Sequence, residues 1–143
     1  MVDLVRGISP PFDPAAVVEE LSALAKQYRI REVFGDNYSA EWTATAFREN
    51  GLRYTANDLP MSGLALEALP QFMRGQLQIP NHPKLIKELR LLERRTSRQG
   101  RDIIGHGRNG NDDHCSALFS AMRPRQWQRL RSASLQATAQ AAL

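Results

Sequence analysis

Two acidic sites stand far apart in the sequence and suggest shared chemistry on a phosphate. Asp36 follows the apolar run that ends at Gly35, and Asp112 and Asp113 follow Asn111 at the start of an apolar, helix-like segment. Cleavage of a phosphodiester by two divalent metal ions needs several carboxylates close together, because the two ions lie about 4 Å apart and bind the attacking and leaving oxygens. The pattern therefore favours metal-dependent chemistry on a phosphate backbone.

Both acidic sites also have a purely structural interpretation. Asp36 is equally suited to capping the turn into a helix that begins near Ser39. Acidic residues in the first turn of a helix gain about 0.3–1 kcal/mol from the helix dipole, which would account for Asp112 and Asp113. The residues alone leave these alternatives open.

A basic segment lies between the two acidic sites. Its cations are Lys84, Lys87, Arg90, Arg94, Arg95, Arg98, Arg101 and Arg108. A helix over residues 83–95 would place Lys87, Arg90 and Arg94 on one face, where they could follow the phosphates of DNA. A solvated helix face is the alternative. The segment that follows begins with the acidic residues Asp112 and Asp113, and this adjacency favours nucleic acid as the partner.

The remaining reactive residues do not define a site of their own. His106, His114 and Cys115 match no common zinc spacing and lack a fourth ligand. Neighbouring helical residues point about 100° apart, so His114 and Cys115 do not form a nucleophilic pair. A single cysteine excludes an internal disulfide and fits a reducing cytoplasm.

The composition is that of one globular domain. The chain has 143 residues, 42% of them apolar, and a net charge of +4, which favours polyanionic partners. It has no signal-peptide pattern and no run of roughly 20 apolar residues, so we expect a soluble protein.

The first half of the chain alternates strand and helix patterns. Strands are predicted over residues 2–9, 31–34 and 52–56. A helix capped by Asp13 begins at Pro14, and a second one, with Trp42 and Phe47 in the core, runs from a Ser39 cap to Gly51. This order predicts an α/β fold with right-handed parallel crossovers and a sheet covered on both faces.

The second half is predicted to be mainly helical. Helices are expected over residues 62–74, 83–95 and from Asp112 to Pro124, with an extended piece over 76–80 and a short strand over 102–104. Residues 125–143 are rich in Ala, Gln, Ser and Arg and are expected to be a frayed helix or disordered.

Several segments, taken in order, resemble one family, the C-terminal nuclease domain of the large terminase subunit of tailed bacteriophages and prophages. The matching segments are Pro10-Pro11-Phe12-Asp13-Pro14, Val33 to Trp42, His82 to Leu89, Leu92 to Thr96, and Gly100-Arg101-Asp102 leading to Asp112-Asp113. The resemblance covers residues 2 to about 122.

The resemblance implies a ribonuclease-H-like fold and a hydrolase, an Mg²⁺- or Mn²⁺-dependent endonuclease that cuts double-stranded viral DNA during genome packaging. Asp36 and the Asp112-Asp113 pair match the places of catalytic, metal-binding acids. Implied partners are DNA, the terminase small subunit and the portal protein, in the cytoplasm of the bacterial host. Residues 84–101 supply the cations expected to bind DNA.

The sequence departs from the family pattern at several points. The first catalytic aspartate of the family lies upstream of the segment that matches residues 2–9, so the fold is expected to lack its first strands. Asn111 stands where histidine is usual, and Gly105 where an acid is common. Residues 1–123 would then be a partial, N-terminally truncated nuclease domain and 124–143 a tail. The alternative is a catalytically dead DNA-binding fragment or prophage remnant.

Overall fold

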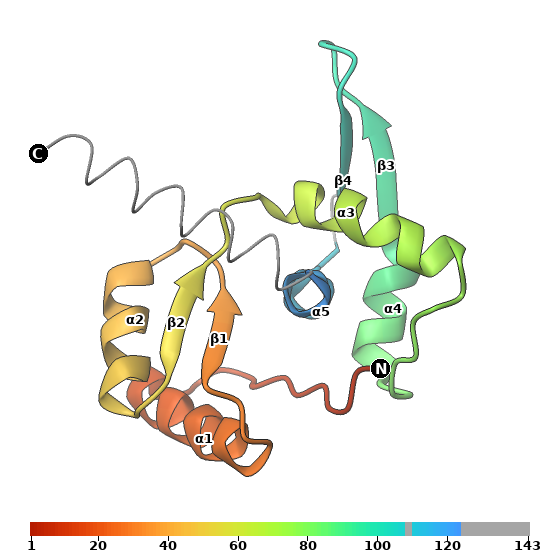
Figure 1. Cartoon of the computed structure of the whole chain (residues 1–143). Coiled ribbons are helices and arrows are strands. Elements are labelled where there is room, and N and C mark those ends of the chain that lie inside the picture. Colours follow the sequence, from red (N-terminus) through yellow and green to blue (C-terminus); the bar gives the residue numbers. More distant parts are fainter. Residues whose placement is uncertain (108–109, 124–143) are drawn as a thin grey trace, which may run out of the picture.

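The computed structural model describes residues 1–107 and 110–123 and shows a mixed α/β protein (Figure 1). Its elements are α1 (Pro14–Gln27), β1 (Glu32–Gly35), α2 (Ala40–Glu49), β2 (Arg53–Ala56), α3 (Met61–Met73), α4 (Pro83–Leu91), β3 (Leu92–Thr96), β4 (Asp102–His106) and α5 (Asp113–Met122). The predictions for Pro124 and for residues 125–143 lie outside the described residues. In the part of the chain that is described, no helix is long and apolar enough to cross a membrane.

Residues 32–56 fold as the strand-helix-strand part of the prediction. Asp13 caps α1, because its Oδ1 accepts the Ala15 N–H at 3.0 Å. β1 and β2 pair in parallel, with Phe34 opposite Thr55, so the crossover through α2 is confirmed. Gly51 follows α2 with a φ of +73°, a conformation that glycine adopts without steric cost.

A small core joins α1 and α2 to this sheet. Its buried members are Val18, Ala25, Phe47 and Leu52. The ring of Phe47 stacks on that of Tyr54, with centroids 5.7 Å apart. The placement of Trp42 in the core was wrong, since Trp42 is 49% exposed. Trp42 lies five positions before Phe47, about 140° away around the helix, so burial of Phe47 turns Trp42 toward solvent.

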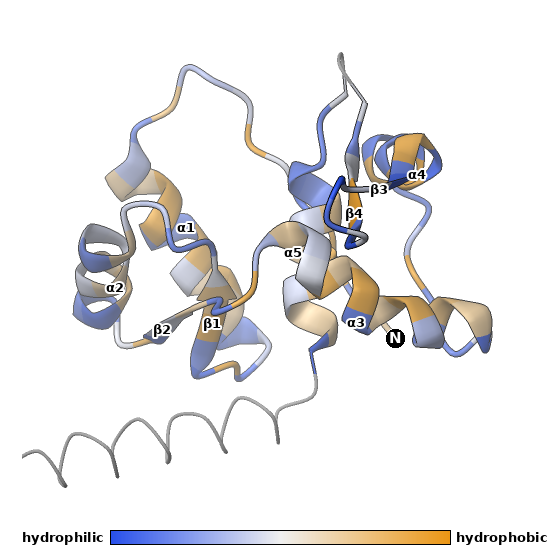
Figure 2. Cartoon of the chain, turned by 90° about the horizontal axis from the view of Figure 1, so that it is seen from above, coloured by the Kyte–Doolittle hydropathy of each residue, from blue (hydrophilic) through white to orange (hydrophobic). Residues whose placement is uncertain are grey.

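A second core lies among α3, α4 and α5. Its buried members are Leu64, Ala65, Ala68, Leu85, Cys115, Leu118 and Phe119. α4 carries hydrophobic and hydrophilic residues on different sides, and its hydrophobic side contributes Leu85 (Figure 2). α5 contacts β1 as well as α3 and α4, so it links the two halves of the molecule.

The predicted helix over residues 83–95 ends at Leu91. Residues 92–96 instead form β3, which pairs antiparallel with β4 and places Arg94 opposite Ile104. A tight turn closes this hairpin, with the Gly100 N–H bonded to the Ser97 carbonyl at 2.9 Å. The helical spacing was misleading here, because pairing with a strand ten residues away is a non-local effect that overrides local periodicity.

The predicted strand over residues 2–9 is absent. Within the described structure this segment is extended, and its one backbone bond to another part of the chain joins the Val2 N–H to the Gln78 carbonyl at 2.9 Å. Val2 and Val5 pack against the second core. The alternating pattern marked an extended chain, but a strand also needs a neighbouring ladder. Among the described residues, the sheet predicted from three strands therefore has two, and a separate two-stranded hairpin accompanies it.

Candidate functional site

The predicted acidic pair opens α5. Asp112 is the residue before the helix and Asp113 is its first residue. Asn111 links them, because its Oδ1 accepts the Asp112 N–H at 3.0 Å and its Nδ2 donates to Asp113 Oδ2 at 2.9 Å. Asp112 is half-buried and Asp113 is exposed. Carboxylate oxygens at a helix N-terminus thus face partly solvated space, where a cation or a polar ligand has access.

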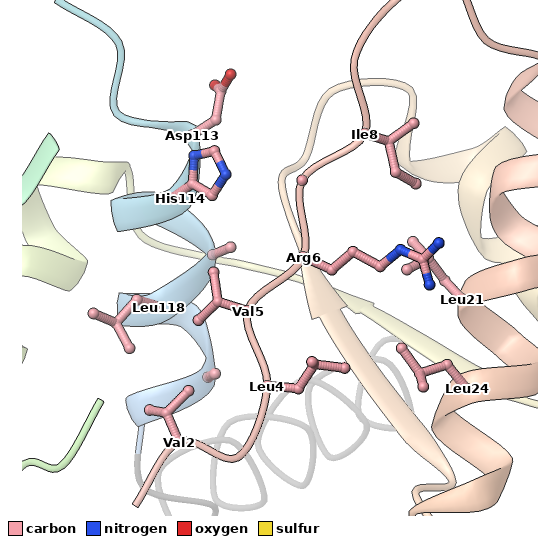
Figure 3. A pocket seen from close by; sticks show the side chains of 13 residues that line it. Val2, Leu4, Val5, Arg6, Ile8, Leu21, Leu24, Asp113, His114 and Leu118 are labelled. Atoms are coloured by element: carbon pink, nitrogen blue, oxygen red, sulfur yellow. The ribbon is translucent and has the colours of Figure 1, made fainter. Parts of the chain in front are cut away.

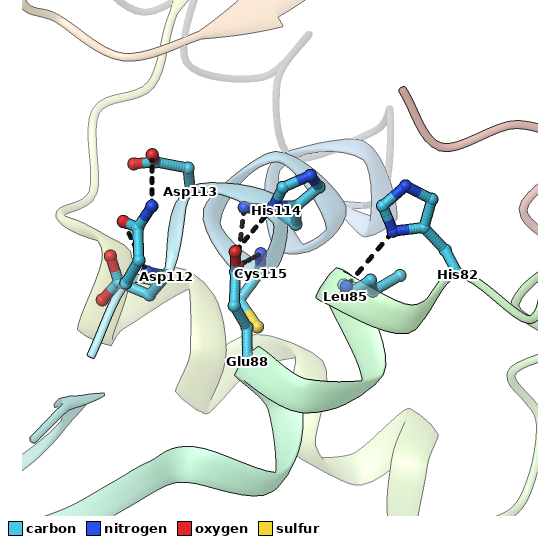
Figure 4. A network of polar contacts seen from close by, with 8 residues as sticks. His82, Leu85, Glu88, Asp112, Asp113, His114 and Cys115 are labelled. Carbon is cyan, nitrogen blue, oxygen red and sulfur yellow. Dashed lines mark hydrogen bonds and ion pairs between the residues drawn. The ribbon is translucent and has the colours of Figure 1, made fainter. Parts of the chain in front are cut away.

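Glu88 of α4, which the sequence analysis missed, holds the start of α5 (Figure 4). Its Oε2 accepts the His114 N–H at 2.8 Å and the Cys115 N–H at 3.2 Å. Its Oε1 accepts from His114 Nδ1 at 2.6 Å. Glu88 is 8% exposed and follows the buried Leu85 by three positions. An acid on the buried face of an amphipathic helix was the signal available in the sequence.

Two histidines pack together beside this contact. The rings of His82 and His114 have centroids 5.1 Å apart. His82 caps α4, since its Nδ1 accepts the Leu85 N–H at 3.2 Å. His114 Nε2 is buried and has no hydrogen-bond partner among the described residues. A Cβ on Gly7 would lie 2.7 Å from that nitrogen, so the N-terminal segment covers it closely.

Cys115 is a core residue and not a nucleophile. It is 0% exposed. Burial, together with the nearby charges of Glu88 and Asp112, raises the pKa of its thiol to about 12. The reactive form of cysteine is the thiolate, which is scarce at neutral pH when the pKa is this high.

Asp36 lies directly after β1, as predicted, and is exposed. Its Oδ1 accepts the Asn37 N–H at 2.6 Å, and its backbone carbonyl accepts the Tyr54 hydroxyl at 2.5 Å. Burial, and then the negative charge of Asp36, raise the pKa of Tyr54. Tyr54 therefore stays protonated and holds the turn that carries Asp36.

The turn that carries Asp36 is tied to the C-terminal half of α5 through Asn57, whereas Asp112 and Asp113 lie at its start. Asn57, at the end of β2, donates from Nδ2 to Ser120 Oγ at 2.8 Å, and its N–H bonds the Gly35 carbonyl next to Asp36. Ser120 lies seven residues after Asp113, about 10 Å along the helix. Across residues 1–107 and 110–123, no three His, Cys, Asp or Glu side chains gather closely enough to hold a metal ion. A metal site shared by Asp36, Asp112 and Asp113 stays a prediction.

The basic residues are divided between α4 and the hairpin. Lys84, Lys87 and Arg90 lie on α4, Arg94 and Arg95 on β3, and Arg98 and Arg101 at the hairpin tip. The expectation that Arg94 shares a helical face with Lys87 and Arg90 was wrong, because the helix ends before it. Figure 1 shows the hairpin projecting from the rest of the molecule.

Two of these arginines already have acidic partners. Arg94 pairs with Asp102 at 2.5 Å, and Arg95 pairs with Glu93. The other cations of the described basic segment, Lys84, Lys87, Arg90, Arg98 and Arg101, form no ion pair within the described structure. The tip residues Arg98 and Arg101 are exposed and thus available to an anionic ligand.

The Arg94–Asp102 pair predicts a measurable pKa. The hydrogen bond from Arg94 holds the pKa of Asp102 below its ordinary value of 3.8. A lowered folded-state pKa means that the pair stabilises the hairpin above about pH 4 and that this contribution is lost as the pH falls through the folded-state pKa. In an NMR titration of the Asp102 carboxyl carbon, we expect Arg94→Ala to raise the pKa toward 3.8. An unchanged pKa would contradict the pairing.

A mostly apolar cavity of about 460 Å³ lies between α5, α1 and the N-terminal segment (Figure 3). Val5, Leu21, Leu24 and Leu118 line it, and His114 lies at one end. Arg6 and Asp113 also line it, and Arg6 pairs with Glu20. This lining suits an apolar group and not a phosphate.

The fold is similar to that of a phage large terminase nuclease. Two solved structures carry this likeness, the large terminase nuclease from thermophilic phage G20c and the same nuclease with bound cobalt. Their TM-scores are 0.60 and 0.63, with 23% sequence identity. The match covers 75% of this chain and 60% of the nuclease, so the chain spans about 60% of the length of that domain. No protein-family model and no curated protein matches the chain.

The family resemblance expected from the motifs is confirmed in the fold. At 23% identity, the likeness establishes the arrangement of helices and strands and leaves the chemistry to be argued from the site.

Proposed function

We propose that this chain is a terminase-type nuclease domain, an endonuclease that cuts double-stranded viral DNA during genome packaging. The observation that carries the proposal is the fold shared with the G20c large terminase nuclease, with Asp36 at the end of β1 and the Asp112-Asp113 pair at the start of α5. In this role its partners are DNA, the terminase small subunit and the portal protein, in the cytoplasm of a bacterial host.

The donor chemistry of the acidic pair fits a hard divalent cation. Mg²⁺ and Mn²⁺ take carboxylate oxygens, and Asp112 and Asp113 supply them from adjacent positions. One structure of the G20c nuclease holds cobalt, which supports a divalent metal in this fold. Asp36 lies outside this pair, so the residues described here account for one part of a two-metal centre. A bound cation would supply charge stabilisation at the scissile phosphate.

The roles of the protein groups follow from their placement. Arg98 and Arg101 at the hairpin tip, with Lys84, Lys87 and Arg90 on α4, would bind phosphates along the DNA backbone. Asp112 and Asp113, held by Asn111 and by the start of α5, would face the phosphate that is cut. Hydrolysis adds water across the P–O bond and leaves one strand end with a phosphate and the other with a hydroxyl.

A second candidate is a protein that binds DNA and does not cut it. The observation favouring it is that no three potential ligands cluster in the described part of the chain. Incubation of supercoiled plasmid with the purified protein in Mn²⁺ distinguishes the nuclease from the DNA-binding protein. Relaxed or linear plasmid would support the nuclease, whereas a gel shift without cutting would favour the binding protein.

The hairpin tip makes a prediction about DNA affinity. Arg98→Ala/Arg101→Ala removes two exposed cations that form no ion pair within the described residues. The negative slope of log K against log salt should therefore lose about 1.8 of its magnitude, at roughly 0.9 per phosphate contact. Fluorescence anisotropy with a labelled duplex at several salt concentrations measures this slope. Arg29→Ala/Arg31→Ala, between α1 and β1, is the matched control with the same change in charge. An equal effect in both variants would show that net charge, and not the tip, governs binding.

A further inference from the structure

We infer that Glu88 is a positioning residue for the acidic pair, acting through the backbone at the start of α5 and through His114. This inference rests on the proposed function, because it assigns the role of the pair to DNA cleavage. Glu88 itself is 8% exposed and does not reach the solvated side on which Asp113 lies.

The start of α5 needs an acceptor from elsewhere in the chain. The first N–H groups of a helix have no partner within the helix, and a capping side chain usually accepts one of them. Asp112 is in the capping position but makes no capping hydrogen bond through its side chain. Glu88 fills this role from α4, accepting the His114 and Cys115 N–H groups through one oxygen. Its negative charge also suits the positive end of the helix dipole.

The same arrangement leaves the Asp112 carboxylate free of the backbone of α5, while the Asp113 carboxylate accepts from Asn111 Nδ2. A capping Asp112 would commit its carboxylate to the backbone of its own helix, as Asp13 does at α1. With Glu88 accepting the backbone donors, the Asp112 side chain is available for a ligand.

The support is rigid because Glu88 is itself held. It lies one helical turn from Leu85, which is 0% exposed in the second core. Its second oxygen accepts from His114 Nδ1, and the His114 ring packs against His82 and under Gly7. Side chains that orient the ligands of a site in this way are typical partners of metal and catalytic groups.

The inference is tested by measuring the affinity of the full chain for Mn²⁺, with the EPR signal of the free ion as the readout. We expect Glu88→Ala to weaken Mn²⁺ binding by about tenfold or more. Glu88→Gln keeps an oxygen for the two backbone N–H groups without the charge and should recover most of the affinity. Ser120→Ala disturbs the other end of α5, where Ser120 bonds Asn57, and should leave Mn²⁺ binding unchanged.

Hydrogen exchange of the His114 and Cys115 amides, measured by NMR, provides a second readout independent of the metal. We expect faster exchange in Glu88→Ala than in Ser120→Ala. If Glu88→Ala does not fold, the Mn²⁺ affinity of Glu88→Gln is compared with that of the unchanged protein. A large loss of Mn²⁺ affinity in Glu88→Gln would contradict the inference, because it would mean that the charge of Glu88 matters and not its positioning of the backbone.

The outcomes separate the inference from the proposed function. Absence of Mn²⁺ binding by the unchanged protein would overturn the metal-dependent function and the inference with it. Mn²⁺ binding that is equally tight in the unchanged protein and in a folded Glu88→Ala variant would overturn the inference alone.

Discussion

Replacement of both Asp112 and Asp113 by Asn should lower the rate of plasmid cleavage in Mn²⁺ by at least about a hundredfold. The reason is that the bound cation, which would supply several kcal/mol of charge stabilisation, would lose both of its carboxylate ligands at the start of α5. The change is nearly isosteric and keeps the backbone contacts of Glu88 to the helix. Initial rates of conversion of supercoiled to nicked plasmid, across a series of Mn²⁺ concentrations, measure the effect.

A matched control removes two charges elsewhere. Asp3 and Glu19 are exposed and lie in the N-terminal segment and α1, so Asp3→Asn/Glu19→Gln should cut at the unchanged rate. Asp36→Asn tests the other acidic site alone and should also impair cutting if Asp36 shares the reaction. Cleavage at the wild-type rate by the Asp112→Asn/Asp113→Asn variant would show that the pair takes no part in the reaction and would contradict the proposed site.

Leu85→Ala is expected to lower the free energy of unfolding by about 2–5 kcal/mol. Leu85 is 0% exposed and packs in the core formed by α3, α4 and α5. Its truncation leaves a cavity as well as losing the transfer free energy of the removed carbons. A domain of this size should show a drop in melting temperature of roughly 10 °C or more, followed by circular dichroism at 222 nm.

The control for this variant lies in the same helix. Leu91 is the last residue of α4 and is 49% exposed, so Leu91→Ala should change stability by only about 0.5 kcal/mol. Both variants replace the same residue type on one helix and differ mainly in burial. Equal losses from the two would show that Leu85 does not hold the core together as the structure indicates.

Local signals in the sequence predicted those elements whose causes are local. Asp13 before Pro14 marked the start of α1, and Gly51 marked the end of α2, because capping and left-handed backbone conformations depend on one or two residues. The start of α5 was readable from the acidic residues Asp112 and Asp113, because the helix dipole favours negative charge in the first turn. The prediction of a helix over residues 83–95 was wrong for residues 92–95, because pairing with β4, a non-local contact, makes them part of a strand.

The candidate site shows the same division. The sequence by itself determined the residue types, namely acidic residues after β1 and at the start of α5, a basic segment between them, and an order of motifs that resembles terminase nucleases. Only the tertiary structure decided that Glu88 accepts the N–H groups of α5 and that Arg94 pairs with Asp102 of the neighbouring strand. The physical reason is that these contacts join residues on different elements, and their distances depend on how the helices and strands pack.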